Sequence, residues 1–277
     1  MKLRSVVVSG VAWFLLAVAV SWSALPILLV VMSSLKDPRT IFDFPPRLVF
    51  WPELTSYHSL LVAWPQITGS LTNSLIITLA SGALTLILSM PAAYAYSRFR
   101  SAYLRVSAFF ILAVRMFPPI IITIPLFPFL QRIGLMDRHA MLVVLYVTFN
   151  VSLTSWLMKS FIDDVPVEIE EAALIDGCTR WQVIRRVTVP LTAPGLVAAT
   201  VFAALLAWNE FQFAFIFTST RARTMPILIN EMLGSVTGVE WGPLFAAATL
   251  QLAPILVFLL VVQRHLIRGM TVGSVKG

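Results

Sequence analysis

Long stretches without a charged residue constrain this chain more than any other feature of its sequence. Five blocks lack Asp, Glu, Lys and Arg, and a sixth is interrupted only by Arg115: Ser5–Leu35, Leu54–Ser97, Ala140–Met158, Leu191–Asn209, Trp241–Gln263 and, with the arginine, Val106–Leu130. A bilayer core of about 30 Å is spanned by roughly 20 apolar residues in a helix. Each block is therefore long enough to cross a membrane once.

The composition agrees with a membrane protein that crosses the bilayer several times. Charged residues make up 12 % of the chain, about half the share that is usual in soluble domains. We expect an all-α polytopic fold and a single transmembrane domain over residues 1–277. The first block is too long for the apolar core of a secretory signal, so we treat it as a transmembrane helix. The expected spans cover residues 8–32, 70–96, 106–128, 140–158, 194–217 and 243–263.

The placement of Lys and Arg predicts the orientation. With six spans, one side of the membrane carries twelve of these residues and the other side seven. The richer side holds Lys2, Arg4, Arg98, Arg100, Arg105, Lys159, Arg180, Arg185, Arg186, Arg264, Arg268 and Lys276. This side should be cytoplasmic, which places both termini and the polar segment 159–193 inside the cell. The net charge of +7 is mostly this topological signal, so we expect membrane lipid and no nucleic acid as a partner.

No motif in the sequence predicts catalysis. The chain lacks a phosphate-binding G-x-x-x-x-G-K-[ST] loop and a G-x-S-x-G nucleophile motif. His58, His139 and His265 are far apart and fit no metal-ligand spacing. We therefore expect a non-catalytic membrane subunit without a metal or cofactor of its own.

Segment 159–193 predicts two short helices separated by a glycine. Pro166 suits the first turn of a helix, and the acids after it complement the positive end of the helix dipole. Gly177 suits a helix C-terminus that needs a positive φ. "TRWQ" at 179–182 is a capping box that starts a second helix, which we expect to end before Pro190.

This helix–turn–helix is either a solvated linker or a docking element. A linker needs neither this length nor the small side chains of Ala172 and Ala173, which would let another protein approach the backbone closely. A membrane chain without a nucleotide site can be driven by contact with a partner, through a rigid-body shift of its spans.

The same residues resemble the signature of binding-protein-dependent ABC importer permeases, EAA-x₃-G-x₉-I-x-L-P. The matching positions are Glu171, Ala172, Ala173, Gly177 and Pro190, with valine in place of Ile and Leu at 187 and 189. Further stretches are similar to the maltose-importer type of this family: "NSLIITLASGALTLILSMPAAYAYSRF", "RMFPPIIITIPLF", "AWNEF" and "GMTVGSVKG". The resemblance covers essentially the whole chain.

The resemblance implies a type I ABC importer permease fold in a bacterial cytoplasmic membrane, with segment 159–193 as its coupling helices. It implies a heterodimer with a sister permease, two copies of a cytoplasmic ATPase that binds ATP and Mg, and an extracytoplasmic substrate-binding protein. The implied function is alternating-access import of a carbohydrate or another polyhydroxy solute. A permease of another ABC importer branch and a secondary transporter remain alternatives, and the sequence does not select a particular sugar, polyol or glycerol-phosphate compound.

Two ionisable residues lie inside the expected spans, and such residues usually face a pathway or a partner group. These are Arg115 and Glu210, the latter next to Trp208 and Asn209. Together they could line a translocation path, because an indole and polar side chains suit a hydroxyl-rich solute. Alternatively, the two charges pair with each other, or each binds backbone carbonyls or the sister permease.

Overall fold

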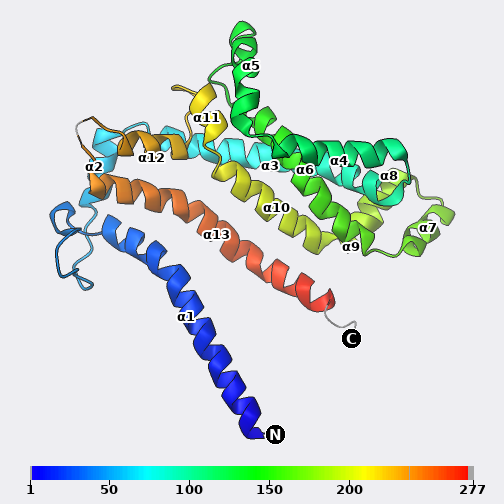
Figure 1. The fold of residues 1–277 in the computed structure, drawn as a ribbon, viewed down its shortest axis with the longest axis horizontal. Helices are drawn as coiled ribbons and strands as arrows, with labels where there is room; N and C mark the ends of the chain where they lie inside the picture. The colour runs from blue at the N-terminus through cyan, green and yellow to red at the C-terminus, as the bar shows by residue number, and fades with distance from the viewer. Residues whose placement is uncertain (1, 237, 274–277) are drawn as a thin grey trace. The chain divides into compact units, whose positions relative to one another are not determined.

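The computed structural model describes residues 2–236 and 238–273, which form helices and no strands (Figure 1). The side chains of residues 2–8 and 264–273 lie outside this description, as do residues 274–277 at the end of the "GMTVGSVKG" stretch. The basic residues counted at both termini therefore lie outside the described side chains. The chain forms two compact units, Met1–Ile67 with Ile229–Ala253 and Thr68–Leu228 with Pro254–Gly277.

Unit 1 combines the N-terminal helix with the start of the last helix. Its elements are α1 (Lys2–Ser34), the 3₁₀ turn η1 (Pro38–Thr40), α2 (Thr55–Ala63), the end of α12 (Met225–Leu233) and the first part of α13 (Trp241–Gly273). Between Ser9 and Ser34, α1 is apolar and buries almost none of its surface within the chain. Such a helix must be covered by lipid or by another protein.

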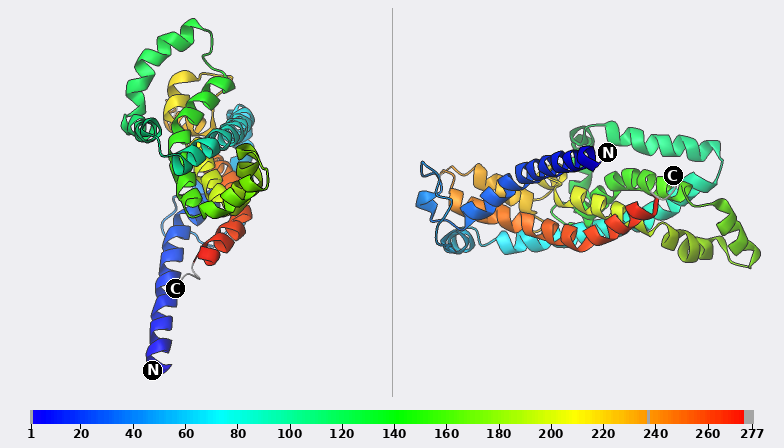
Figure 2. Two further views of the ribbon diagram at one scale, coloured as in Figure 1. Left: turned by 90° about the vertical axis from the view of Figure 1, so that its right-hand side faces the viewer. Right: turned by 90° about the horizontal axis from the view of Figure 1, so that it is seen from below.

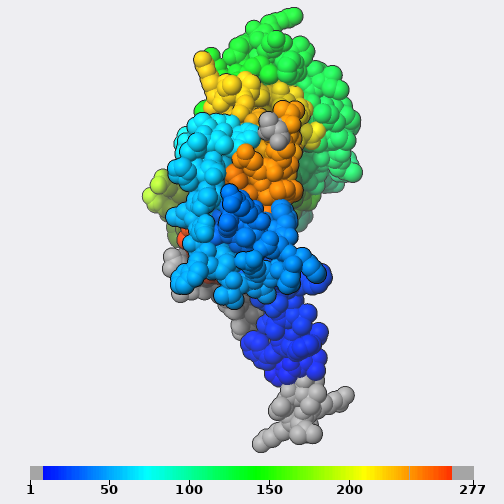
Figure 3. All heavy atoms as spheres, turned by 90° about the vertical axis from the view of Figure 1, so that its left-hand side faces the viewer, coloured from blue at the N-terminus to red at the C-terminus, as the bar shows by residue number. Residues whose placement is uncertain are grey.

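The segment after α1 packs against the start of α13. Trp241 meets Phe42 edge-to-face, with 5.3 Å between the ring centroids. Gly242 lies so close to Ser56 that an added Cβ would be 2.8 Å from its hydroxyl oxygen. Figure 3 shows the segment between α1 and α3, in lighter blue, gathered in one mass at the end of α1.

Unit 2 holds the remaining membrane helices and the polar segment 159–193, which we call the coupling segment after its expected role. Its long helices are α3 (Ile67–Arg98), α4 (Ala102–Met116), α5 (Pro119–Arg132), α6 (His139–Asp163) and α10 (Ala193–Trp208). The short helix α11 (Gln212–Phe217) follows α10. Within this unit α6 is central, because α4, α10 and α11 all pack against it. At Gly195, α10 lies close to α6, because an added Cβ would be 2.3 Å from the ring of Phe161.

The expected third span, 106–128, is not one straight helix. The chain breaks after Met116, and α4 and α5 meet at an angle of 90° (Figure 1). Pro118 and Pro119 explain the break, because proline lacks a backbone donor and disfavours helical geometry in the residue before it.

The expected fifth span, 194–217, is also interrupted. Helix α10 ends at Trp208 and α11 begins at Gln212. The carboxylate of Glu210 accepts hydrogen bonds from the backbone NH groups of Phe213 (2.8 Å) and Ala214 (3.2 Å), which starts a new helix. Before α10, the helical run Arg180–Leu191 is bent by 83° from Ala193–Trp208.

Four helices are each long and apolar enough to cross a membrane, and the number rises to six if each bent pair counts as one span. The helix of span four runs over His139–Asp163, so residues 159–163 of the expected loop belong to α6. The all-helical, multi-span fold is thus confirmed.

Candidate functional site: the coupling segment and the charged cavity

The coupling segment begins with α7 (Val167–Ile175), which ends at a glycine, as expected. Gly177 has φ = +87°, a conformation that strains residues with a Cβ. The Cys178 NH donates to the Ala173 carbonyl (3.0 Å) and the Gly177 NH donates to the Leu174 carbonyl (3.1 Å). This pair of bonds is a Schellman motif, which satisfies the last carbonyls of the helix. The turn is therefore fixed by the backbone geometry of Gly177.

The second helix starts at the predicted capping box. The Gln182 NH donates to the Thr179 hydroxyl (3.3 Å), and the Thr179 NH donates to the Gln182 side-chain oxygen (2.7 Å). These reciprocal bonds begin α8 (Arg180–Val183). Figures 1 and 2 show α7, in yellow-green, at one end of unit 2.

The expectation that this helix ends before Pro190 is wrong. It continues as a π-helical turn η2 (Ile184–Thr188) and then α9 (Val189–Leu191), in which Pro190 lies near the start. A π turn bonds each NH to a carbonyl five residues back, as the Val189 NH does to Ile184. This wider turn accommodates a proline, which has no NH to donate. The helical run ends one residue after Pro190, at Leu191.

The outward surface of α7 is apolar in part. Ile169 and Ile175 are exposed, the latter by 86 %, and so is Trp181 of α8. Ala172 is exposed between the two isoleucines, whereas Ala173 is half-buried. Residues three apart on a helix share a face, so Ile169, Ala172 and Ile175 form one apolar stripe. Large apolar side chains exposed in a polar loop are typical of a docking surface.

One acid of the segment points inward and binds the end of α3. Glu170 is 3 % exposed. It accepts two hydrogen bonds from Arg98, Nε to Oε2 at 3.0 Å and Nη2 to Oε1 at 3.1 Å. The hydroxyls of Tyr94 (3.1 Å) and Thr188 (2.9 Å) donate to the same carboxylate. We call these four residues the Arg98–Glu170 cluster.

The arginine of this cluster also reaches the end of α6. Its Nη2 donates to the carbonyls of Ile162 (3.0 Å) and Val165 (2.8 Å). A cation at these carbonyls also complements the negative end of the α6 dipole. Arg98 and Glu170 therefore join α3, α6, α7 and η2 at one buried point. Two-point pairing of this kind fixes geometry as well as charge.

The sequence assigned both residues other roles. From the sequence, Arg98 is one of the basic residues that predict the cytoplasmic side of the membrane. Glu170 is one of several acids near the start of a helix. Glu171, which is in the matching motif, is exposed, whereas its neighbour Glu170 is buried. A single sequence carries no signal that distinguishes the two acids, because the choice depends on where α3 ends in space.

The two charges inside the apolar blocks line one cavity. It measures about 210 Å³, and its walls include Arg115, Tyr146, Asn150 and Glu210. The Arg115 guanidinium donates to the carbonyl of Phe149 (3.1 Å), while Glu210 accepts the backbone NH groups that start α11. Arg115 and Glu210 form no ion pair with each other in the part of the chain that the structure describes. Each charge is held by backbone, and both face the same space.

The other two residues expected on the path lie elsewhere. Trp208 is 4 % exposed and lines a separate apolar hollow of about 100 Å³, beside Leu75 and Phe258. The side chain of Asn209 donates back to the Leu205 carbonyl (2.9 Å) within α10. The structure thus brings Arg115 and Glu210 together and leaves Trp208 and Asn209 out of their cavity. Residues on successive positions of a helix end face different directions, which explains the separation.

At the other end of unit 2, one carboxylate organises a loop. Asp137 has φ = +55°. Its oxygens accept six hydrogen bonds of 2.9–3.1 Å from residues 219–222, four of them from backbone NH groups. Partial burial opposes ionisation, but these NH groups outweigh it and lower the pKa of Asp137 below its usual value of 3.8. Asn73 closes the same loop by donating to the carbonyls of Arg221 (2.8 Å) and Arg223 (2.9 Å).

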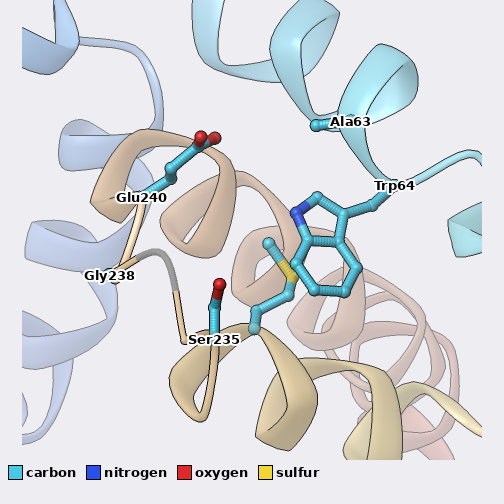
Figure 4. A pocket seen from close by; sticks show the side chains of 6 residues that line it. Ala63, Trp64, Ser235, Gly238 and Glu240 are labelled. Carbon is cyan, nitrogen blue, oxygen red and sulfur yellow. The ribbon is translucent and has the colours of Figure 1, made fainter.

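Unit 1 carries a hollow of its own, of about 180 Å³. Figure 4 shows Trp64 on one wall and Ser235 and Glu240 on the other. None of the residues predicted as functional lines it. Among residues 2–236 and 238–273, no three His, Cys, Asp or Glu side chains are grouped closely enough to hold a metal ion.

Comparison with known proteins identifies a family and a fold. Residues 85–272 match the family described as "Binding-protein-dependent transport system inner membrane component". The chain is 34 % identical over 263 residues to the trehalose transport system permease protein SugB of Mycobacterium tuberculosis, covering 93 % of this chain and 94 % of SugB. It is 31 % identical over 252 residues to the trehalose/maltose transport system permease protein MalG of Thermococcus litoralis, covering 90 % of each.

The fold is similar to that of a chain in the crystal structure of a bacterial ABC transporter involved in import of the acidic polysaccharide alginate. The TM-score is 0.73 at 21 % identity, over 93 % of this chain and 96 % of the other. At this identity the similarity establishes the fold alone.

Proposed function

The chain belongs to the family of binding-protein-dependent transport system inner membrane components, and on this premise we propose that it imports a carbohydrate or related polyhydroxy solute by ATP-driven alternating access. Two relatives similar over nine-tenths of the chain or more are named for trehalose or for trehalose and maltose, which supports the carbohydrate class. The multi-span helical fold supports a membrane permease subunit.

The coupling segment carries the proposal. It combines an exposed apolar stripe (Ile169, Ala172 and Ile175) with a buried anchor at Glu170. A surface that only solvates a linker needs neither feature. The stripe would dock on a cytoplasmic ATPase, which binds ATP and Mg, and the anchor would pass the movement of that ATPase to α3 and α6. A rigid contact is required, because the energy source lies in another chain.

The charged cavity would form part of the transport path. Arg115 and Glu210 lie in the expected membrane spans and face one space with Tyr146 and Asn150. Polar groups already held by backbone bonds can meet hydroxyl groups without binding them tightly. Trp208 and Asn209 do not line this cavity, so Arg115 and Glu210 are the two residues that we place on the path.

The proposed assembly follows the family. This permease would pair with a sister permease, bind two ATPase copies and receive solute from an extracytoplasmic binding protein. Both termini and the coupling segment would lie in the cytoplasm of a bacterial cell. The exposed apolar surface of α1 supports additional contacts with lipid or with the sister chain.

Reconstitution tests the proposal. The permease pair, the ATPase and the binding protein are placed in liposomes, and uptake of labelled trehalose, maltose and glycerol 3-phosphate is measured with and without ATP. Ala172→Arg should prevent the ATPase from co-purifying and should abolish uptake. Asp164→Arg, at the exposed C-cap of α6, is the matched control and should leave both unchanged. Normal uptake by Ala172→Arg would disprove the docking role, and uptake without ATP would indicate a secondary transporter.

A further inference from the structure

A second charged cavity lies at the end of unit 2 that carries the coupling segment. It measures about 360 Å³ and lies between the end of α3, the start of α4 and the last turns of α6. Six side chains define its character: Phe99, Arg100, Arg105, Phe109, Trp156 and Lys159. The proposed path uses none of them, and Arg180 of the coupling segment contacts one of them, lying over the ring of Phe99 at 5.2 Å from its centroid.

The rim of this cavity is positively charged. Lys159 is paired with Asp163. Arg100 and Arg105 have no carboxylate within ion-pair distance in the described residues 2–236 and 238–273. The cavity therefore presents two uncompensated guanidinium groups. Guanidinium groups bind phosphate oxygens through two parallel hydrogen bonds.

The wall below the rim is apolar and aromatic. On α4, Phe109 lies one helical turn beyond Arg105 and is 72 % exposed. Trp156 of α6 is half-buried and donates from Nε1 to the Ala108 carbonyl at 3.0 Å, which fixes its ring against α4. Arg105 thus lies near the start of α4, and Phe109 and the indole of Trp156 lie about one turn further along it. This order matches a charged head group followed by an acyl chain.

The position also fits a membrane surface. Arg98 ends α3, Ala102 begins α4 and Asp163 ends α6, so the rim lies where three membrane helices leave the apolar region. Trp and Tyr are enriched at this depth. On the orientation given under the proposed function, on which this inference rests, the rim faces the cytoplasmic leaflet. Basic pockets between membrane helices on that side bind anionic lipid head groups.

We propose that this cavity binds an anionic phospholipid, with the glycerophosphate group at Arg100 and Arg105 and an acyl chain along Phe109. The charge selects an anionic lipid over phosphatidylcholine, whose head group has no net charge. The aromatic wall selects a lipid over free phosphate.

Native mass spectrometry of the purified transporter complex tests the site. The complex is prepared in nanodiscs of phosphatidylcholine containing phosphatidylglycerol, and bound lipids are counted after release. Arg100→Gln with Arg105→Gln should remove one tightly bound phosphatidylglycerol, with roughly 30-fold weaker retention, as expected for the loss of two bases near a membrane surface. The single variant Arg105→Lys, with Arg100 unchanged, should largely retain the lipid.

The control removes the same charge elsewhere. Arg185→Gln with Arg186→Gln changes two exposed bases of η2 that lie outside the cavity and should keep the lipid. Equal loss in both double variants, unchanged binding in the first, or displacement by millimolar inorganic phosphate would each overturn the site. Loss of the sister permease from the first variant would show that a protein covers this surface instead. Because lipid is counted without transport, failure here is distinguishable from failure of the proposed import.

Discussion

A single carboxylate organises each of two ends of unit 2, and the two carboxylates differ in their partners. Glu170, at the coupling end, is 3 % exposed and is paired with a cation that is itself nearly buried. Asp137, at the other end, forms no ion pair in the described part of the chain and is held mainly by backbone NH groups of residues 219–222. The first joins side chains from several helices, whereas the second shapes one loop.

The difference determines what each end can transmit. A buried ion pair is costly to open because each charge loses its partner in a region without water. Movement of α7 would therefore carry α3 with it. The Asp137 carboxylate is only partly buried, so water can replace it at the loop NH groups and the Asp137 end can open locally. We therefore expect the end with Glu170 to move as one body and the end with Asp137 to exchange its hydrogen bonds locally.

Breaking the ion pair should have the largest effect. Arg98→Ala leaves Glu170 buried without its cation, and we expect local destabilisation of about 3–5 kcal/mol. Hydrogen exchange of peptides covering 162–190 should rise, and the ATPase should co-purify poorly. Arg98→Leu combined with Glu170→Leu removes both charges and should restore much of the protection. If the double variant is no better protected than Arg98→Ala, the ion pair is not the anchor.

We expect the next largest loss of stability from backbone strain. Each end of unit 2 has a residue with positive φ, Gly177 at one end and Asp137 at the other. Gly177→Val places a Cβ at φ = +87° and should cost about 1–3 kcal/mol. No other atom lies within 4 Å of the added Cβ, so the cost would come from conformation rather than from a clash. Gly177→Asn should be milder, because Asn tolerates this region. Equal ATP-dependent uptake by the wild type, the Val variant and the Asn variant would exclude a need for this turn.

A smaller effect is expected at Asp137. Asp137→Asn keeps one acceptor oxygen and loses the charge, which should cost about 1 kcal/mol and raise hydrogen exchange over 219–222. Asp137→Gly removes every side-chain bond but relaxes φ, so it separates hydrogen bonding from strain. If Gly protects the loop as well as Asp does, the carboxylate contributes nothing.

Acid should act on the same loop. The pKa of Asp137 is lower when folded than its usual value of 3.8. Its stabilisation is therefore present above about pH 4 and is lost as the pH falls through the folded value. Exchange of peptide 219–222, corrected for the intrinsic rate, should increase below pH 4 in the wild type and change little in Asp137→Asn. The same pH dependence in both proteins would assign the effect to other groups.

The smallest stability change is expected at Glu210, a carboxylate that also caps a helix. Glu210→Gln retains an oxygen for the NH groups of Phe213 and Ala214, so assembly should be normal while uptake changes. Glu210→Leu leaves these donors without their acceptor and should reduce both. Assembly is measured by co-purification with the sister permease. Unchanged uptake in Glu210→Leu would remove this residue from the transport path.

Much of this structure could be predicted from local patterns. The uncharged blocks predicted the membrane helices, and Gly177 with the Thr179 capping box predicted the helix–turn–helix. These features depend on residues within one or two turns of each other. The failures are of another kind: the choice of Glu170 rather than Glu171 depends on Arg98, far away in the sequence. Likewise, only the three-dimensional fold separates Trp208 from Arg115 and Glu210.

The breaks in spans three and five show a further limit. Pro118 and Pro119 were visible in the sequence, but an uninterrupted apolar block hides whether its prolines kink a span or end it. The continuation of the coupling helix through Pro190 is the converse case. There the proline predicts the end of a helix, but the helix continues through it by way of a wider turn.

The wide turn at Ile184–Thr188 also governs how this segment tolerates insertions and deletions. A π turn contains one residue more than an α turn, and one residue corresponds to about 100° of helical rotation. Deleting one residue here would produce an ordinary helix and rotate everything before it by that angle relative to α9. Trp181 and the apolar stripe of α7 would then face a different direction with their amino acids unchanged. The length of this turn, rather than its composition, thus sets the direction in which the chain presents the apolar stripe of α7.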